Sequence, residues 1–243
     1  MRTTLILGAG SDMAKAIAHR FARTGDQLLL AARRPDELSE NAKDLQIRYQ
    51  TNVHILEFDA LDYESHKSFY ASLPERPDVT VCVFGYLGDQ EKARHEFEEA
   101  SRILHTNFTG AVSILNIIAD DYEKHGEGSM IGISSVAGDR GRQSNYIYGS
   151  AKAGFSAYLS GLRNRLSKSG VQVLTVKPGF VATSMTEGMD LPGALTATPD
   201  KAAEDIFKAF EKQYNVLYTM WMWRYIMCVI RSIPEFVFKR LSL

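Results

Sequence analysis

The stretch T-T-L-I-L-G-A-G-S-D-M-A, from Thr3 to Ala14, sets the expected fold. Its apolar first half is typical of a short buried strand, which the glycine-rich G-A-G turn then ends. Ser11 or Asp12 can cap a following helix, in which apolar residues recur every four positions from Met13 to Phe21. A strand, a glycine turn and a helix form the unit from which parallel sheets are built.

The same alternation continues along the chain. Helical stretches separate further strands, which we expect at residues 27–31, 53–58, 79–84, 129–134, 171–176 and 216–219. This order predicts an α/β protein with a Rossmann-like, doubly wound parallel sheet, helices on both faces and ligands at the carboxyl ends of the strands. No linker-like segment interrupts residues 1–219, which we expect to form one catalytic domain. Residues 220–243 are expected to form an apolar and basic helical extension.

Composition narrows the functional classes. The chain has 243 residues, 45% of them hydrophobic and 23% charged, with a formal net charge of −1. This fits a globular domain with a sizeable core and gives no electrostatic case for a nucleic-acid partner. Cys82 and Cys228 lie far apart without metal-binding spacing, so we expect reduced thiols and no structural metal. The apolar run before Gly8 is too short for a signal peptide and no run could span a bilayer, so we expect a cytoplasmic protein.

The first glycine turn predicts a dinucleotide site. Gly8 and Gly10 would let the backbone approach a pyrophosphate at the N-terminus of the helix. The pattern is not the full G-x-G-x-x-G, because Met13 stands where the third glycine would be. The carboxylate of Asp12 would repel a pyrophosphate unless it faces away as a helix cap.

The end of the second strand bears on the choice of cofactor. It reads A-A-R-R and holds no acidic residue for the ribose hydroxyl of NAD. Arg33 could instead pair with the 2′-phosphate of NADP, although a solvated basic turn is the alternative. We therefore expect NADP(H), with NAD(H) as the second choice. At the end of the third strand, Asp59 could hydrogen-bond an adenine amino group or cap a helix.

A tyrosine and a lysine stand four residues apart in S-N-Y-I-Y-G-S-A-K-A-G, from Ser144 to Gly154. On a helix, Tyr148 and Lys152 would share one face. The ammonium would favour the phenolate and lower the pKa of the tyrosine from its usual value of about 10. Such a tyrosine could exchange a proton with a substrate near neutral pH.

Four motifs together resemble the short-chain dehydrogenase/reductase family, from Thr3 to about Thr186. They are the glycine turn, H-T-N-F-T-G, I-S-S-V-A-G and Y-G-S-A-K, in the family's order and spacing. The resemblance implies a catalytic set of Asn107, Ser135, Tyr148 and Lys152. Ser135 stands thirteen residues before the tyrosine, as in the family, whereas Ser134 is one residue off. Tyr146 has no lysine four residues after it.

The resemblance also implies a cofactor site. The run K-P-G-F-V-A-T, Lys177 to Thr183, is similar to the family segment that holds the nicotinamide carboxamide and the pyrophosphate. The implied cofactor-binding residues are Gly8, Gly10, Ser11, Asp12, Met13, Arg33, Asp59, Ala60, Gly85, Asn107, Tyr148, Lys152, Pro178, Gly179, Val181 and Thr183.

The implied reaction is carbonyl reduction, or oxidation of the matching secondary alcohol, with the cofactor supplying the hydride. Ser135 and Tyr148 would hold the carbonyl oxygen, and Tyr148 would donate the proton. Lys152 would lower the tyrosine pKa and hold the nicotinamide ribose. Asn107 would anchor a water that links Lys152 to solvent, or satisfy the backbone of a kinked helix. The rival interpretation is an NADP(H)-binding, redox-sensing regulator without turnover, against which the complete Ser-Tyr-Lys set argues.

Two features depart from the family pattern. Asp12 and Ala14 replace usual glycines, and V-F-G-Y-L-G-D, residues 83–89, stands where the family has N-N-A-G. Both are similar to a subgroup that reduces a decaprenylphosphoryl keto-pentose. The resemblance to this subgroup implies a sugar, or a sugar linked to a lipid, as the substrate, with a steroid-like or an acyl ketone as the open alternatives.

The C-terminal tail is rich in Trp, Met, Tyr and Ile, with interspersed arginine and lysine and a break at Pro234. It could be a lid or core-covering helix, an oligomer contact, or an amphipathic segment on the inner face of a membrane. The family resemblance implies a homodimer or homotetramer, with a contact along the helix that begins near Tyr148.

Overall fold

The computed structural model describes residues 1–241 and is built around one seven-stranded parallel sheet of order β3-β2-β1-β4-β5-β6-β9. The fold class predicted from the sequence is confirmed. The order reverses between β1 and β4, where a doubly wound sheet binds its ligand. The strands are β1 (Thr3–Leu7), β2 (Gln27–Ala32), β3 (Val53–Glu57), β4 (Val79–Cys82), β5 (Gly128–Ile133), β6 (Val171–Pro178) and β9 (Val216–Thr219).

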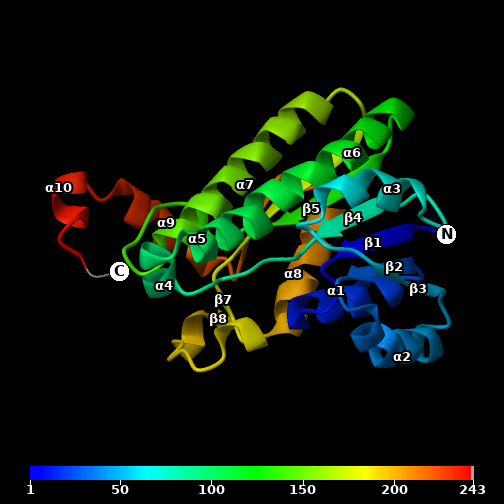
Figure 1. Ribbon diagram of the computed structural model, residues 1–243, viewed down its shortest axis with the longest axis horizontal. Helices are drawn as coiled ribbons and strands as arrows, with labels where there is room; N and C mark the ends of the chain where they lie inside the picture. The colour runs from blue at the N-terminus through cyan, green and yellow to red at the C-terminus, as the bar shows by residue number, and fades with distance from the viewer. Residues whose placement is uncertain (242–243) are drawn as a thin grey trace.

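Helices cover both faces of this sheet (Figure 1). One layer contains α1 (Asp12–Ala22), α2 (Ser39–Tyr49) and α8 (Pro199–Glu211). The other contains α3 (His66–Ala71), α5 (Phe97–Leu104), α6 (Gly110–His125) and α7 (Tyr146–Leu166), with the short α4 (Gln90–His95) beside the start of α7. The two layers bury the central strands completely, which is why those strands read as nearly continuous apolar runs.

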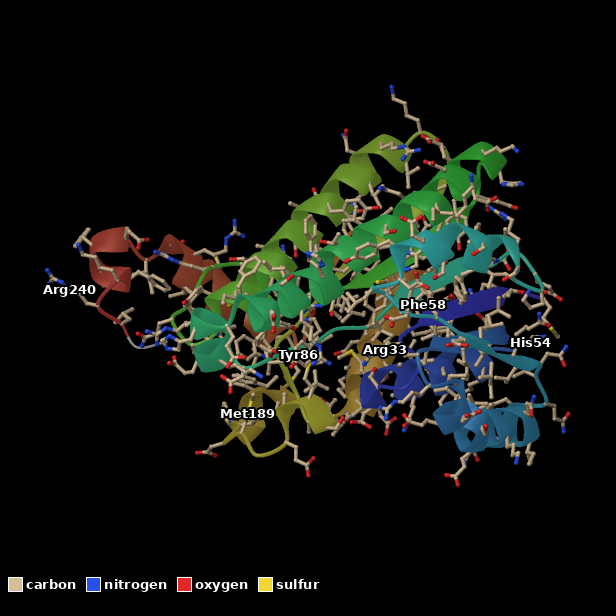
Figure 2. All side chains as sticks on the ribbon, in the orientation of Figure 1. Arg33, His54, Phe58, Tyr86, Met189 and Arg240 are labelled. Atoms are coloured by element: carbon tan, nitrogen blue, oxygen red, sulfur yellow. The ribbon has the colours of Figure 1, made fainter. Side chains whose placement is uncertain are left out.

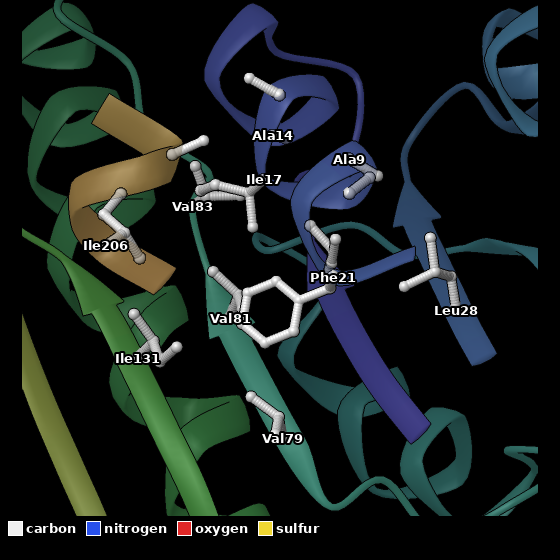
Figure 3. Close-up of a cluster of buried hydrophobic side chains, with 14 of the residues drawn as sticks. Ala9, Ala14, Ile17, Phe21, Leu28, Val79, Val81, Val83, Ile131 and Ile206 are labelled. Atoms are coloured by element: carbon white, nitrogen blue, oxygen red, sulfur yellow. The ribbon is translucent and has the colours of Figure 1, made fainter. Parts of the chain in front are cut away.

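The core between α1, α8 and the sheet fixes the first helix against the strands (Figure 3). Phe21 of α1 is fully buried and packs edge-on against Phe207 of α8, with ring centroids 5.1 Å apart. Ile17, one turn earlier, is also fully buried. This packing holds the N-terminus of α1 at the carboxyl end of β1, where the glycine turn lies.

The helical region expected from residue 91 to residue 125 is interrupted twice. Glu96 is extended and separates α4 from α5. A π-helical turn, η3 (His105–Thr109), then separates α5 from α6 and contains Asn107. Within this π-helical turn, the side-chain amide of Asn107 donates a hydrogen bond to the backbone carbonyl of Ile103, one turn earlier. The other single-turn helices are η1 (Pro35–Leu38), η2 (Tyr63–Ser65), η4 (Val136–Gly138), η5 (Ser184–Thr186) and η6 (Gly193–Leu195).

The last part of the chain folds against the carboxyl end of the sheet. A two-stranded sheet of β7 (Phe180–Val181) and β8 (Thr196–Ala197) precedes it. The C-terminal segment, residues 220–241, contains α9 (Met222–Ser232) and α10 (Glu235–Phe238), divided at Pro234 as expected. In Figure 1, α10 projects from one end of the molecule. Residues 242 and 243 of the predicted extension lie outside the described residues.

The two faces of α9 differ. Trp223 and Met227 are buried, whereas Trp221, Tyr225 and Val229 are exposed. Cys228 is exposed on this outer face, whereas Cys82 is buried in β4. Within residues 1–241, no helix is long and apolar enough to cross a bilayer, and no group of side chains is arranged to bind a metal ion.

Candidate active site

The glycine turn after β1 has the shape that the sequence predicts. Gly8 adopts a positive φ of 91°, and a Cβ there would lie 2.6 Å from Phe84, so only glycine fits. A Cβ on Gly10 would meet no described atom within 4 Å, so this backbone faces open space. Ser11 caps α1, because its hydroxyl accepts a hydrogen bond from the amide of Ala14 at 3.2 Å. The turn thus leaves room for a ligand at the helix N-terminus.

Asp12 follows this turn and is not the helix cap, because Ser11 holds that position. Its carboxylate accepts a hydrogen bond from the amide of Ser184 at 2.8 Å, across 172 residues of sequence. This bond holds the pKa of Asp12 below its usual value. The negative charge that would oppose a pyrophosphate is therefore engaged with the segment that follows β7, and that segment is tied to the start of α1.

Arg33 lies exposed beyond the carboxyl end of β2, and Figure 2 labels it together with Tyr86, which follows β4. Its neighbour Arg34 pairs with Glu37 at 2.7 Å, whereas Arg33 forms no ion pair with any residue that the structure describes. Its charge therefore remains available to a ligand. Asp59 is not the cap of the next helix, η2, which follows Asp62; its carboxylate accepts a hydrogen bond from the amide of Leu61 at 2.9 Å in the turn after β3.

Ser135 and Tyr148 come together from two different elements. Ser135 follows β5 and Tyr148 lies in the first turn of α7. Burial raises the pKa of Tyr148 to about 12, while a hydrogen bond from Ser135 acts in the opposite direction. Ser134 serves the fold instead, because its hydroxyl is buried between the carbonyl of Lys152 and the hydroxyl of Ser156. The spacing argument that selected Ser135 agrees with this arrangement.

Lys152 lies under the tyrosine and is itself buried. Its Nζ donates to the carbonyl of Ile133 at 3.0 Å and lies 5.7 Å from the centroid of the Tyr148 ring. Burial lowers the pKa of Lys152 to about 8. The pKa of Tyr148 thus lies above its usual value and not below it as expected, because burial is the largest influence on the phenol.

Asn107 stands behind the lysine and is almost fully buried. Its side chain accepts from the amide of Tyr86 at 3.1 Å and donates to the carbonyls of Tyr86 and Ile103. A Cβ on Gly85 would lie 3.0 Å from the Asn107 amide oxygen and 3.5 Å from Lys152 Nζ. Asn107 therefore joins the end of β4 to the π-helical turn and stands beside Lys152. Ala60 is also buried here, and its carbonyl oxygen would be 2.2 Å from a Cβ on Gly110.

The predicted nicotinamide segment begins at the end of β6. Pro178 is the last residue of that strand, and Gly179 abuts Trp223 so closely that a Cβ would lie 1.9 Å from the indole nitrogen. Val181 pairs with Ala197 in the small sheet, and Thr183 opens η5 through a capping box with Thr186. The segment is thus held between Asp12 at one end and α9 at the other.

Three residues at this end of the sheet were not singled out by the sequence. Asp139 accepts hydrogen bonds from Lys177 and Tyr218, and Arg140 binds the end of α9. Trp223 fills the space beside Gly179 and donates to the carbonyl of Leu195 at 3.1 Å. The sequence did hold one indication of these contacts, the D-R-G-R run at residues 139–142 between Ser135 and Tyr148. Charged residues in so short a loop need oppositely charged or polar partners nearby.

Comparisons with known proteins agree with this geometry. The family model of short chain dehydrogenases matches residues 2–191. An uncharacterised oxidoreductase of Mycobacterium tuberculosis is 38% identical over 240 residues, covering 98% of this chain and 96% of that protein. The NADP-dependent 3-hydroxy acid dehydrogenase of Schizosaccharomyces pombe is 26% identical over 231 residues and 89% of each chain. A short-chain dehydrogenase structure from Sphingobium yanoikuyae, in complex with NADPH, superimposes with a TM-score of 0.84 over 97% of each chain, at 24% identity.

Proposed function

Because the chain belongs to the short-chain dehydrogenase family, we propose that it uses NADP(H) to reduce a carbonyl group, or to oxidise the matching secondary alcohol, at Ser135, Tyr148 and Lys152. The family makes the chain an NAD(P)-dependent oxidoreductase. The observation that carries the residue assignment is the approach of Tyr148, in the first turn of α7, to Ser135 and to the buried Lys152, whose Nζ lies 5.7 Å from the centroid of the tyrosine ring.

The chain's own residues supply the acid and the polarising groups. NADPH, when bound, supplies the hydride. The hydroxyls of Ser135 and Tyr148 hold the carbonyl oxygen and stabilise the charge that develops on it. A pKa of about 12 keeps the Tyr148 phenol protonated at neutral pH, and an alkoxide is a stronger base than a phenolate, so the proton passes to the substrate.

The proposed cofactor fits the residues that the structure brings together. The open space beside Gly10 and the N-terminus of α1 suit a pyrophosphate, and the carboxylate of Asp12 is engaged by the amide of Ser184. The exposed Arg33 suits a 2′-phosphate. The Sphingobium relative in complex with NADPH and the NADP-dependent yeast enzyme support the phosphorylated cofactor.

Turnover itself tests the proposal. Purified protein with NADPH and a panel of ketones, consisting of diacetyl, ethyl acetoacetate and ribulose, should oxidise NADPH in the presence of at least one of them. If NADPH binds and no ketone in a widened panel is reduced, the result would favour the redox-sensing regulator over the reductase.

We expect Arg33→Ala to raise the dissociation constant for NADPH by about tenfold or more, because a charge-assisted hydrogen bond to the phosphate is lost. The dissociation constant for NADH should change little, since NADH lacks that phosphate. Fluorescence titration of both nucleotides measures the effect. Arg34→Ala is the matched control, because Arg34 already pairs with Glu37. Equal losses for the two nucleotides would remove Arg33 from the 2′-phosphate.

A finer proposal is that the carbonyl belongs to a sugar, or to a sugar carried on a lipid, and that the C-terminal segment rests on an anionic membrane surface. The outer face of α9 supports it, with exposed Trp221 and Tyr225 in contact and Val229 one turn further on. The segment carries four cationic side chains against one acidic side chain, Glu235. The cationic ones are Arg224, Arg231, Lys239 and Arg240. Aromatic residues with arginine and lysine suit the headgroup level of a bilayer.

In a density gradient, we expect the protein to float with vesicles of equal parts phosphatidylcholine and phosphatidylglycerol. With vesicles of phosphatidylcholine alone, it should remain in the bottom fraction. Truncation at Met220 would remove the buried Trp223 and Met227, so substitution is the sharper test. Changing Trp221, Tyr225 and Val229 together to serine should abolish flotation, because these exposed side chains contribute the apolar contact. If the wild-type protein binds neither kind of vesicle, the proposal of a membrane-bound C-terminal segment is contradicted.

A further inference from the structure

Arg140 connects the loop between Ser135 and Tyr148 to the C-terminal segment. Its guanidinium donates to the carbonyls of Ile230 at 2.8 Å, Ile233 at 2.6 Å and Arg231 at 3.2 Å. It also pairs with Glu235 at 2.9 Å. Only 15% of the side chain is exposed. One side chain therefore binds three carbonyl groups at and just beyond the end of α9, and its charge suits the negative end of the helix.

The other side of Arg140 is covered by the end of the chain as well. Its guanidinium carbon lies 3.7 Å from the centroid of the Phe238 ring in α10. Arg140 thus holds α9 and α10 at the same time, and does so with directional bonds. Bonds of this kind fix the position of a loop more tightly than apolar packing alone.

The residues before Arg140 in this loop are held just as firmly. Asp139, whose side chain is 3% exposed, accepts hydrogen bonds from Lys177 in β6 and from the hydroxyl of Tyr218 in β9. Val136 is buried with Trp223 and Met227 of α9. Residues 136–140 are therefore clamped by the edge of the sheet and by the C-terminal segment.

On its opposite side, the same loop presses against the catalytic helix. A Cβ on Gly138 would lie 2.7 Å from the backbone of Lys152, and a Cβ on Gly149 would lie 2.9 Å from the carbonyl of Ala137. Contacts this close leave no room for the loop to shift without moving α7. The loop therefore lies between Tyr148 and Lys152 on one side and the C-terminal segment on the other.

Ser135 depends on this loop for its direction. Its hydroxyl accepts a hydrogen bond from the amide of Ala137 at 3.1 Å, and the same side chain acts on the pKa of the neighbouring Tyr148. If residues 136–140 relax, the amide of Ala137 moves and the Ser135 hydroxyl loses the hydrogen bond that orients it.

We propose that Arg140 is a positioning residue, and that through it the C-terminal segment, residues 220–241, becomes part of the active site. Arg140 fixes the loop, the loop orients Ser135, and Ser135 orients Tyr148 toward the carbonyl oxygen. The inference rests on the proposed carbonyl reduction, but not on membrane contact. Placing a catalytic hydroxyl off by about 1 Å can cost roughly a hundredfold in rate.

The test compares Arg140→Gln, Arg140→Lys and the control Arg48→Gln, which removes an exposed, ion-paired arginine from α2. With NADPH and the best ketone of the panel, Arg140→Gln should lower kcat by about tenfold or more. The dissociation constant for NADPH should stay within about twofold, because Arg140 binds the C-terminal segment and is not among the residues assigned to the cofactor. Arg140→Lys should restore part of the loss, since an ammonium can still bind the carbonyl groups. Arg48→Gln should behave as wild type.

A double-mutant cycle separates positioning from general stability. In a Ser135→Ala background, Arg140→Gln should cost less than about threefold, because the group that Arg140 positions is already absent. A loss of kcat that is equal in both backgrounds would overturn the inference, as would an unchanged kcat in Arg140→Gln.

A readout without turnover keeps this inference distinct from the proposed function. Hydrogen exchange of the peptide that spans residues 133–148 should quicken in Arg140→Gln and stay unchanged in Arg48→Gln. If the wild-type protein reduces no carbonyl compound, the proposed function fails. The exchange measurement then tests by itself whether Arg140 fixes the loop that holds Ser135. Exchange at the wild-type rate in Arg140→Gln would then refute the link.

Discussion

Tyr148→Phe should lower kcat for carbonyl reduction by about a thousandfold, because the variant keeps the ring and loses the only proton that Ser135 and Lys152 help to place. The affinity for NADPH should stay within about twofold, since the phenol hydroxyl faces the substrate. Stopped-flow measurement of NADPH oxidation and fluorescence titration of the nucleotide report the two quantities separately. The loss should appear in kcat more than in KM, because the proton is needed only as the alkoxide forms.

Tyr146→Phe is the matched control for this substitution. Tyr146 lies two residues earlier on the same helix, and 42% of it is exposed. Its removal should leave turnover unchanged. A Tyr148→Phe variant that keeps full activity, or one that loses NADPH together with activity, would contradict the assigned role.

Lys152→Met should lower kcat by about a hundredfold and should also alter how stability depends on pH. Burial holds the pKa of Lys152 at about 8 in the folded protein, against a usual value of 10.5. Between these two values the unfolded chain binds more protons than the folded one, so the free energy of unfolding gains a contribution as the pH rises. From pH 7 to pH 10, that contribution is about 2 kcal/mol.

Urea unfolding of both proteins at pH 7 and pH 10 measures this difference. The wild-type protein should gain about 2 kcal/mol relative to Lys152→Met over that range, because methionine has no proton to lose. Because both proteins contain the same other titrating groups, the contributions of those groups to the pH dependence of stability cancel in the comparison. Parallel pH dependences would mean that Lys152 keeps its usual pKa in the folded state, and the burial that the structure shows would then have no electrostatic effect.

The fold could be predicted because it depends on local patterns, and the candidate site because its motifs resemble those of a family. Apolar runs ended by glycine mark the strands, and the spacing of thirteen residues in the resembled family selects Ser135 over Ser134. The helix period places Tyr148 above Lys152. Each of these is decided within about twenty residues of sequence, and short-range periodicity carries that information.

What the sequence could not show depends on contacts between distant segments. Nothing near Asp12 indicates that its carboxylate binds the amide of Ser184, so its place in the glycine turn stayed ambiguous. The pKa of Lys152 follows from burial, which tertiary packing creates and helical spacing does not reveal. The indole of Trp223 contacts Gly179, which lies 44 residues earlier in the sequence. The sequence of the tail predicts an amphipathic helix, but it does not indicate which residues pack against the buried face of that helix.

The two cysteines offer a way to observe the C-terminal segment in the unaltered protein. Cys82 is buried in the sheet, and burial raises the pKa of its thiol to about 12, so it reacts slowly with maleimides. Cys228 lies exposed on the outer face of α9, between Arg224 and Ser232. A fluorophore or spin label therefore attaches at one position without any engineered residue. Its emission colour or its collision rate with lipid-soluble oxygen would report directly whether that face meets water, lipid or another molecule.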